Sequence, residues 1–318
     1  MASGEFFKLM KSLKAGFNRK RAKPLLGTFV VVSAKGPDEG AADQAIEKAF
    51  EAVAKVQRHM STHDPESDIS RLSRMKPFIP ISVDPWTHEV LTLSRRISLA
   101  SEGFFDVTVG GKLEDLGFLS RGKGSARPWG EATYADVDLL PGSRVLLRRP
   151  CRLDLGGIAK GFAVDKAVEA ALGVPGVRDV VVNAGGDLRL KTSKPQAIWF
   201  RDPFRPDHFW PGGFMKDGAL ASSGGTESVR DSSQGLRTPI LRPGQNRAPK
   251  LVFGVSVFAP ACVLADALTK VALLAPASLA QKTLDVFQAK AWIAKKDGFM
   301  EISKSPVGFP NRLGKLGL

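Results

Sequence analysis

The chain of 318 residues carries a net charge of +14 at pH 7, with 43% hydrophobic and 25% charged residues. These proportions are those of a packed globular protein, and the length allows one large domain or two modest lobes, which argues against a miniprotein or a solenoid. The two cysteines, Cys151 and Cys262, cannot build a disulfide framework, and no run reaches the roughly 18 apolar residues of a membrane span, whereas the positive charge favours an anionic partner.

Residues 1–24 form a basic segment that we expect to be separate from the domain of residues 25–318. Residues 5–23 contain a single acid, Glu5, and seven basic residues: Lys8, Lys11, Lys14, Arg19, Lys20, Arg21 and Lys23. Apolar residues recur at helical spacing, which predicts a basic amphipathic helix that contacts an anionic membrane or docks on its own protein. Because the segment lacks the apolar core and cleavage site of a secretory signal, we expect a cytoplasmic protein, with membrane association as an option.

The first half of the chain alternates short strands with amphipathic helices. The expected elements are, in order, a strand at 25–32, a core-facing helix at 41–60, a turn at 67–72, a helix at 89–101, a glycine-rich loop at 121–130 and strands at 145–147 and 151–155. The second half continues with a helix at 158–172, a strand at 177–183, irregular basic stretches at 202–216 and 231–250, a strand at 252–258, helices at 261–274 and 279–289, and a strand at 291–293. No internal repeat interrupts this order.

The strongest motif is the run from Leu153 to Gly161, with the sequence Leu-Asp-Leu-Gly-Gly-Ile-Ala-Lys-Gly. A strand that enters a helix through paired glycines lets the backbone approach a ligand closely, and a helix N-terminus offers amides and a partial positive charge to phosphate. Lys160 adds a full charge in the first helical turn. The run matches neither the Walker pattern nor the dinucleotide pattern, and by itself such a turn more often serves strand-to-helix packing.

Five further motifs accompany this run in a fixed order: 60–72 (MSTHDPESDISRL), 103–111 (GFFDVTVGG), 183–187 (NAGGD), 222–225 (SSGG) and 265–270 (ADALTK). In this order the set resembles the ApbE family of flavin transferases, which move FMN from FAD onto a threonine or serine of a target protein. The resemblance covers residues 25–293. It implies a single α+β domain of two associated lobes, with mixed sheets flanked by helices and the flavin between the lobes.

The resemblance also implies site residues. The walls of the FAD site would be formed by Leu26, His63, Phe104, Phe105, Asp106, Asp154, Lys160 and Ile240. A Mg²⁺ ion would take the backbone carbonyl of Gly157 and the carboxylate of Asp266, both hard oxygen ligands, with Thr269 as the candidate hydroxyl. Helix capping is the local alternative for Asp154 and Asp266.

Three positions depart from the family pattern. His63 stands where these transferases usually carry tyrosine. Lys270, four residues after Asp266, stands where the metal-binding threonine is expected, and Thr269 is one residue early and about 100° away around the helix axis. We therefore hypothesise that the Lys270 ammonium substitutes for magnesium, in a chain that holds flavin without efficient transfer.

The family's His-Ile-Ile-Asp-Pro-Arg-Thr-Gly stretch aligns best with residues 239–246. Its histidine becomes Pro239 and its aspartate Arg242, so a general acid or base is lost there. Together with Arg237 and Arg247, Arg242 makes this loop cationic.

The expected activity is FAD:protein FMN transfer, in which a target hydroxyl attacks the FMN phosphorus and AMP leaves. Two alternatives use the same fold: a degenerate flavin-binding protein and an FAD pyrophosphatase in which water replaces the protein hydroxyl. The expected partners are a flavin nucleotide and an unidentified flavinylation target. Nucleic acid is not expected, because the basic residues lack aromatic interleaving and a recognised binding module. The residues do not single out a catalytic side chain.

Overall fold

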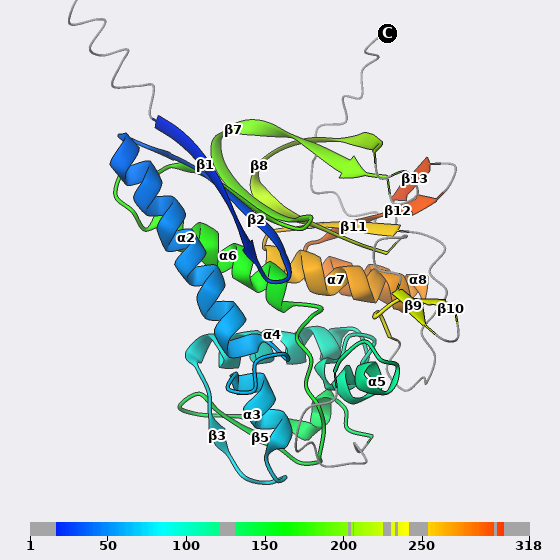
Figure 1. Ribbon diagram of the computed structural model, residues 1–318. Helices are drawn as coiled ribbons and strands as arrows, with labels where there is room; N and C mark the ends of the chain where they lie inside the picture. The colour runs from blue at the N-terminus through cyan, green and yellow to red at the C-terminus, as the bar shows by residue number, and fades with distance from the viewer. Residues whose placement is uncertain are drawn as a thin grey trace, which may run out of the picture.

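The structure, a computed structural model, describes residues 17–120, 131–202, 205, 207–224, 230–232, 235–241, 254–295 and 298–301. The loop expected at 121–130, most of the cationic loop after residue 241 and the first 16 residues lie outside this part. Strands and helices build two associated lobes, an upper one around a large sheet and a lower one of short helices and a small sheet (Figure 1). The expected α+β class is confirmed.

An eight-stranded sheet forms the upper lobe. Its order is β1 (Phe17–Leu25), β2 (Thr28–Gly36), β6 (Asp179–Ala184), β7 (Asp187–Arg201), β8 (Phe209–Gly224), β11 (Gly254–Ala259), β12 (Lys290–Lys295) and β13 (Gly298–Glu301). Each neighbouring pair is antiparallel in the part of the chain that the structure describes. The sheet is therefore antiparallel rather than mixed, since hairpins join most of its neighbours.

Three long helices pack beneath this sheet: α2 (Glu39–Met60), α6 (Ala159–Leu172) and α7 (Cys262–Leu274) (Figure 1). Asp38 caps α2 by accepting a hydrogen bond from the Ala41 amide at 2.8 Å. Asp165 of α6 accepts the amides of Cys262 and Val263, each at 2.8 Å, and so caps α7 from a neighbouring helix. The helices expected at 41–60, 158–172 and 261–274 are confirmed, and α8 (Ala277–Val286) matches the last one with shifted ends.

The lower lobe holds α3 (Asp68–Arg74), α4 (Pro85–Ala100), α5 (Gly110–Asp115) and a sheet of β3 (Ile81–Ser82), β5 (Arg144–Leu147) and β4 (Val137–Leu140). A separate two-stranded ribbon pairs β9 (Arg230–Ser232) with β10 (Gly235–Arg237). None of the helices in the described part combines the length and apolar character needed to cross a bilayer.

The expected amphipathic helix is wrong for residues 17–23, which belong to strand β1. Three of its basic residues face α2, where Arg19 pairs with Glu39, Arg21 with Asp43 and Glu47, and Lys23 with Glu47. Arg19, Arg21 and Lys23 recur at every second position, which is the spacing of a strand. The helical spacing of the apolar residues led to the wrong prediction.

Two other local predictions are wrong. Residues 209–216, expected to be irregular, belong to β8, whose hairpin with β7 contains register shifts near Pro195 and beyond Ile198. Proline cannot donate to a strand ladder and is tolerated at bulges, so the local pattern concealed a strand. Residues 151–155 form no strand, because their amides bond elsewhere: the Asp154 amide donates to the Val107 carbonyl and the Leu153 amide to Ser73 Oγ.

Candidate functional site

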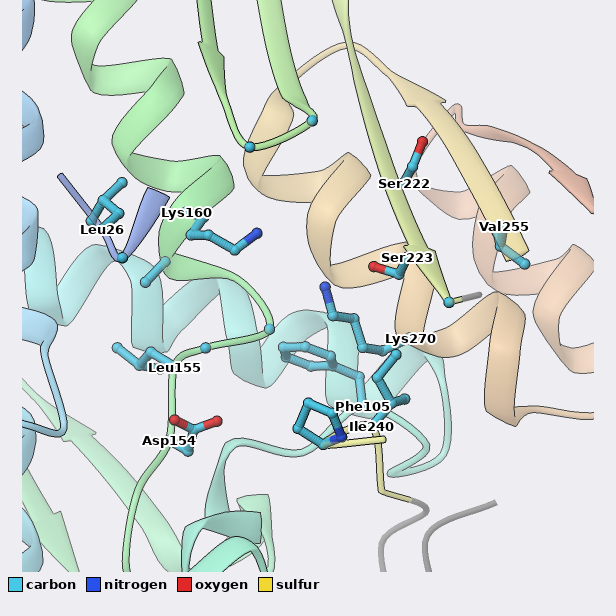
Figure 2. Close-up of a pocket in the computed structure, with 18 of the residues that line it drawn as sticks. Leu26, Phe105, Asp154, Leu155, Lys160, Ser222, Ser223, Ile240, Val255 and Lys270 are labelled. Atoms are coloured by element: carbon cyan, nitrogen blue, oxygen red, sulfur yellow. The ribbon is translucent and has the colours of Figure 1, made fainter. Parts of the chain in front are cut away.

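A cavity of about 1220 Å³ opens where the two lobes meet. All the predicted flavin-contacting residues line it, and so do Gly157 and Lys270. Figure 2 labels Leu26, Phe105, Asp154, Lys160, Ile240 and Lys270 among them. Asp266 and Thr269 do not line it; they are buried behind its wall, with 1% and 0% of their surfaces exposed. A cavity of this size exceeds the volume that most drug-sized ligands need, and it suits a dinucleotide.

The Leu153–Gly161 run forms one wall. Its chain passes Asp154 and Leu155, turns at Gly156 and Gly157, and enters α6, with the Lys160 side chain directed into the cavity (Figure 2). A Cβ atom on Gly157 would lie 3.4 Å from Lys270 Cε and 3.6 Å from the Phe105 ring. Glycine therefore lets both side chains pack against the turn. The turn brings the N-terminus of a fourteen-residue helix to the cavity, which favours an anion there.

Two lysine–carboxylate pairs stand beside this turn. Lys160 Nζ contacts Asp187 Oδ2, and Lys270 Nζ contacts Asp266 Oδ1 and donates to the Asp266 main-chain oxygen at 3.0 Å. Both carboxylates are buried, while the lysine side chains reach the cavity. Figure 2 shows the two lysines pointing toward one another from α6 and α7.

Neighbouring carboxylates keep Lys160 protonated. Burial alone would lower the pKa of Lys160, but the carboxylates of Asp266 and Asp187 outweigh it and raise the pKa above its usual value. Burial would raise the pKa of Asp266, but Lys160 and Lys270 hold it below the ordinary value. Burial and the charge of Asp266 raise the pKa of Asp187 to about 6. Lys160 is therefore a fixed cation of the cavity wall at neutral pH.

Hydrogen bonds fix the hydroxyl groups behind the lysines. Thr269 Oγ1 donates to the Asp266 main-chain oxygen at 2.7 Å and lies 2.7 Å from Ser223 Oγ. Because a hydroxyl has one proton, Ser223 must be the donor in the second bond. Ser222 Oγ lies 2.8 Å from Ser256 Oγ, and both Ser222 and Ser223 line the cavity.

The opposite walls come from the β1–β2 turn and from loops. Leu26 has a positive φ of 56°, and its amide donates to Gln57 Oε1 at 2.6 Å, which holds the apolar side chain at the rim. Backbone strain of this kind in a non-glycine residue is frequent at ligand sites. His63 follows α2 in a loop that is fastened by its own amide, which donates to Ser61 Oγ at 3.2 Å.

Asp106 and Asp154 differ in what surrounds them. Asp106 accepts bonds from the Thr108 amide, the Thr108 hydroxyl and the Tyr134 amide, so it organises the loop that carries Phe104 and Phe105. Burial raises its pKa, and these bonds only partly oppose the shift. Burial also raises the pKa of Asp154, which lies half-buried at the foot of the glycine turn.

Two residues of the site, Asp187 and Gln57, were not predicted from the sequence. Asp187 belongs to the NAGGD motif, but its pairing with Lys160 depends on how the β6–β7 turn meets α6. Gln57 has no motif of its own. A carboxylate directly after Gly185 and Gly186 at a strand exit is the one local signal that could have indicated Asp187.

Fold and site together place a helix N-terminus and two lysines at one cavity, an arrangement typical of proteins that bind phosphate groups. The model of the ApbE family matches residues 26–293, and the chain belongs to this family. It thereby confirms the resemblance seen in the motifs.

Curated relatives carry the name FAD:protein FMN transferase. The Rhodobacter capsulatus protein is 31% identical over 257 residues, which cover 76% of this chain and 49% of that protein. The Vibrio cholerae protein is 25% identical over 273 residues, or 80% of each. The chain thus spans about half the length of the Rhodobacter relative.

Solved structures share the fold. The ApbE protein from Thermotoga maritima has a TM-score of 0.78 at 24% identity, covering 90% of this chain and 97% of that one. The flavin transferase ApbE from Vibrio cholerae has a TM-score of 0.73 at 23% identity, covering 90% and 96%.

Proposed function

We propose that this chain is an FAD:protein FMN transferase, which moves FMN from FAD to a threonine or serine hydroxyl of a target protein and releases AMP. The observation that carries the proposal is the cavity wall formed by the Gly156–Gly157 turn, Lys160 and Lys270, an anion site next to apolar and aromatic side chains. Membership of the ApbE family and the names of the curated relatives support the same activity.

In this proposal the diphosphate of FAD lies at the N-terminus of α6 and between the two lysines. The isoalloxazine ring lies against the walls that carry Leu26, His63, Phe104, Phe105 and Ile240. Asp106 keeps the Phe104–Phe105 loop in place, and Asp154 lies at the flavin side of the turn. Apolar walls with a few charged groups are the usual composition of a cofactor site.

The reaction forms one bond and breaks one. The target hydroxyl oxygen attacks the phosphorus that carries the flavin, while the bond from this phosphorus to the bridging oxygen breaks. AMP leaves with that oxygen and its electron pair, and the hydroxyl proton passes to solvent. Catalysis of this kind depends mainly on positioning and on neutralising the charge of the phosphoryl oxygens, which Lys160, Lys270 and the helix amides would supply.

A second candidate, an FAD-binding protein or FAD pyrophosphatase, is favoured by Pro239. It lines the cavity where the family pattern has a histidine, and the neighbouring Ile240 and Leu241 carry no titratable group either. With no proton carrier on this wall, activation of a protein hydroxyl would be slow.

Incubation of the protein with FAD, Mg²⁺ and a threonine-containing peptide from a candidate target separates these functions. Transfer predicts a fluorescent peptide and an equal amount of AMP, with no labelling of a matched Thr→Ala peptide. FMN and AMP without a labelled peptide would indicate hydrolysis. Bound FAD without either product would reject both reactions and indicate an FAD-binding protein without catalytic activity.

The partners and location remain part of the proposal. The acceptor is a protein whose sequence the site does not specify. The proposed location is the cytoplasm, with membrane contact through residues 5–23. This contact would depend mainly on the residues before Phe17, because Arg19, Arg21 and Lys23 already pair with acids of α2.

A further inference from the structure

The carboxylate of Asp266 is fully engaged within the protein. Its Oδ1 contacts Lys270 Nζ, and its Oδ2 accepts the Gly161 amide at 3.1 Å. Its main-chain oxygen accepts from both Thr269 Oγ1 and Lys270 Nζ. Lys270 lines the cavity while Asp266 does not, so the ammonium lies on the cavity side of the carboxylate.

This arrangement does not fit the magnesium ion that the family resemblance implies. Mg²⁺ requires near-octahedral oxygen ligands at about 2.0–2.1 Å. Here Lys270 takes the carboxylate oxygen that such an ion would need, and the Thr269 hydroxyl is bonded to Asp266 and Ser223. The described residues also contain no group of three or more His, Cys, Asp or Glu side chains that could hold a metal.

The outer part of the Lys270 side chain is confined between Gly157 and Asp266. Its Cε and Cδ lie beside Gly157, where a side chain would meet them at 3.4 and 3.8 Å, and only 16% of the side chain is exposed. An ammonium has three N–H bonds. The two contacts with Asp266 use two of them and, among the described residues, leave the third for a ligand in the cavity.

We propose that Lys270 is a built-in cation that binds the diphosphate of FAD in place of a divalent metal ion. This inference depends on the proposed FAD site. Together with Lys160 it gives the phosphate oxygens two protein cations. The buried Asp266 orients Lys270, and the buried Asp187 orients Lys160.

Calorimetric titration of the wild-type protein with FAD tests the inference without a mutation. We expect the dissociation constant in EDTA to agree with that in excess Mg²⁺ within about twofold, because no metal contributes to the affinity. Electron paramagnetic resonance of the FAD-saturated protein should detect no tightly bound Mn²⁺. An affinity that rises about tenfold or more with Mg²⁺, or bound Mn²⁺ at one ion per chain, would overturn the proposal.

The variant Lys270→Thr exposes Asp266 Oδ1 and adds a hydroxyl. We expect its FAD affinity in EDTA to fall about tenfold or more, as for loss of a charge-assisted hydrogen bond, and to recover with Mg²⁺. Lys270→Arg should retain metal-independent binding, and Lys282→Thr, on the exposed side of α8, is the matched control. Wild-type affinity of Lys270→Thr in EDTA would contradict the inference.

The outcomes separate this inference from the proposed function. Metal-dependent FAD binding overturns the inference and leaves transferase activity in place. Metal-independent binding without transfer to any acceptor supports the inference and rejects the transferase. A wild-type chain that binds no FAD with or without Mg²⁺ rejects both.

Discussion

The pairs Lys160–Asp187 and Lys270–Asp266 set the charge beside the glycine turn. When both carboxylates are ionised, the two pairs are neutral overall, and binding of an anion relies on directed N–H bonds and on the end of α6. Protonation of one carboxylate makes the cluster positive. Asp187 is the group that can change in the accessible range, because burial raises its pKa to about 6.

FAD should bind more tightly as the pH falls through about 6. A proton on Asp187 removes the negative charge beside Lys160, so the affinity at pH 5.5 should exceed that at pH 7.5 by up to roughly tenfold. Calorimetry at the two pH values measures the change. In Asp187→Asn the difference should vanish, and in Asp217→Asn, at an exposed position of β8, it should persist. Weaker binding at pH 5.5 in the wild type would contradict the assignment.

Pro239 lines the cavity without offering a proton carrier, so we predict that any transfer is slow. The variant Pro239→His places an imidazole at the cavity wall, and general bases typically contribute about 10²–10⁴-fold, so we expect at least a roughly tenfold faster release of AMP and labelling of the acceptor. Pro80→His, on an exposed turn of the other lobe, should leave both rates unchanged. If Pro239→His labels no faster than the wild type, the missing proton carrier does not limit the reaction.

At the scale of elements, the crossing of α6 and α7 places the lysines side by side. The helices approach at Gly161. A Cβ atom added there would overlap the Cys262 carbonyl group and lie 2.8 Å from Asp266 Cβ. The same glycine donates its amide to Asp266. Close packing at one glycine therefore fixes the position of Asp266, and through it that of Lys270.

Gly161→Ala should lower the free energy of unfolding by about 1–3 kcal/mol, because the overlap with backbone atoms cannot relax by a rotamer change. Gly40→Ala is the matched control in the first turn of α2, where the nearest atom, Asp38 Oδ1, is 3.4 Å away. There alanine should stabilise the helix by up to about 1 kcal/mol. Urea unfolding followed by circular dichroism measures both, and equal stability of the two variants would show that the helices do not depend on this contact.

The sequence predicts the elements whose signals are local. The three long helices follow from their apolar periodicity, and the i, i+4 spacing of Asp266 and Lys270 anticipates the contact between them. The β7–β8 hairpin, the strand β1 and the pair Lys160–Asp187 were not predicted, since each depends on partners far away in the chain. The cavity residues follow from the family motifs, whereas the roles of the site residues stay predictions.

At the scale of the whole molecule, β1 is the edge strand of the large sheet. This strand pairs with β2 along its full length, and its basic residues lie opposite three acids of α2, Glu39, Asp43 and Glu47. About half of the N-terminal charge is thus used within the protein, although surface ion pairs of this kind contribute little individually.

Removal of residues 1–16 should leave FAD affinity and stability intact, and reduce partitioning onto anionic vesicles if this segment is a membrane anchor. Removal of residues 1–23 should in addition lower the free energy of unfolding by roughly 2 kcal/mol or more, since the hydrogen bonds of β1 and the ion pairs with α2 are lost together. Urea unfolding and vesicle sedimentation measure the two effects. Equal stability of the two truncations would show that β1 is dispensable.

The most direct test of the cavity as a flavin dinucleotide site is equilibrium dialysis of FAD against the wild-type protein and Lys160→Met, with Lys282→Met as control. Since Lys160 offers a full charge to the diphosphate at the start of α6, the wild type and the control should bind one FAD per chain, and Lys160→Met should bind at least about tenfold more weakly. Absence of saturable binding to the wild type, or equal affinity in Lys160→Met, would contradict the account.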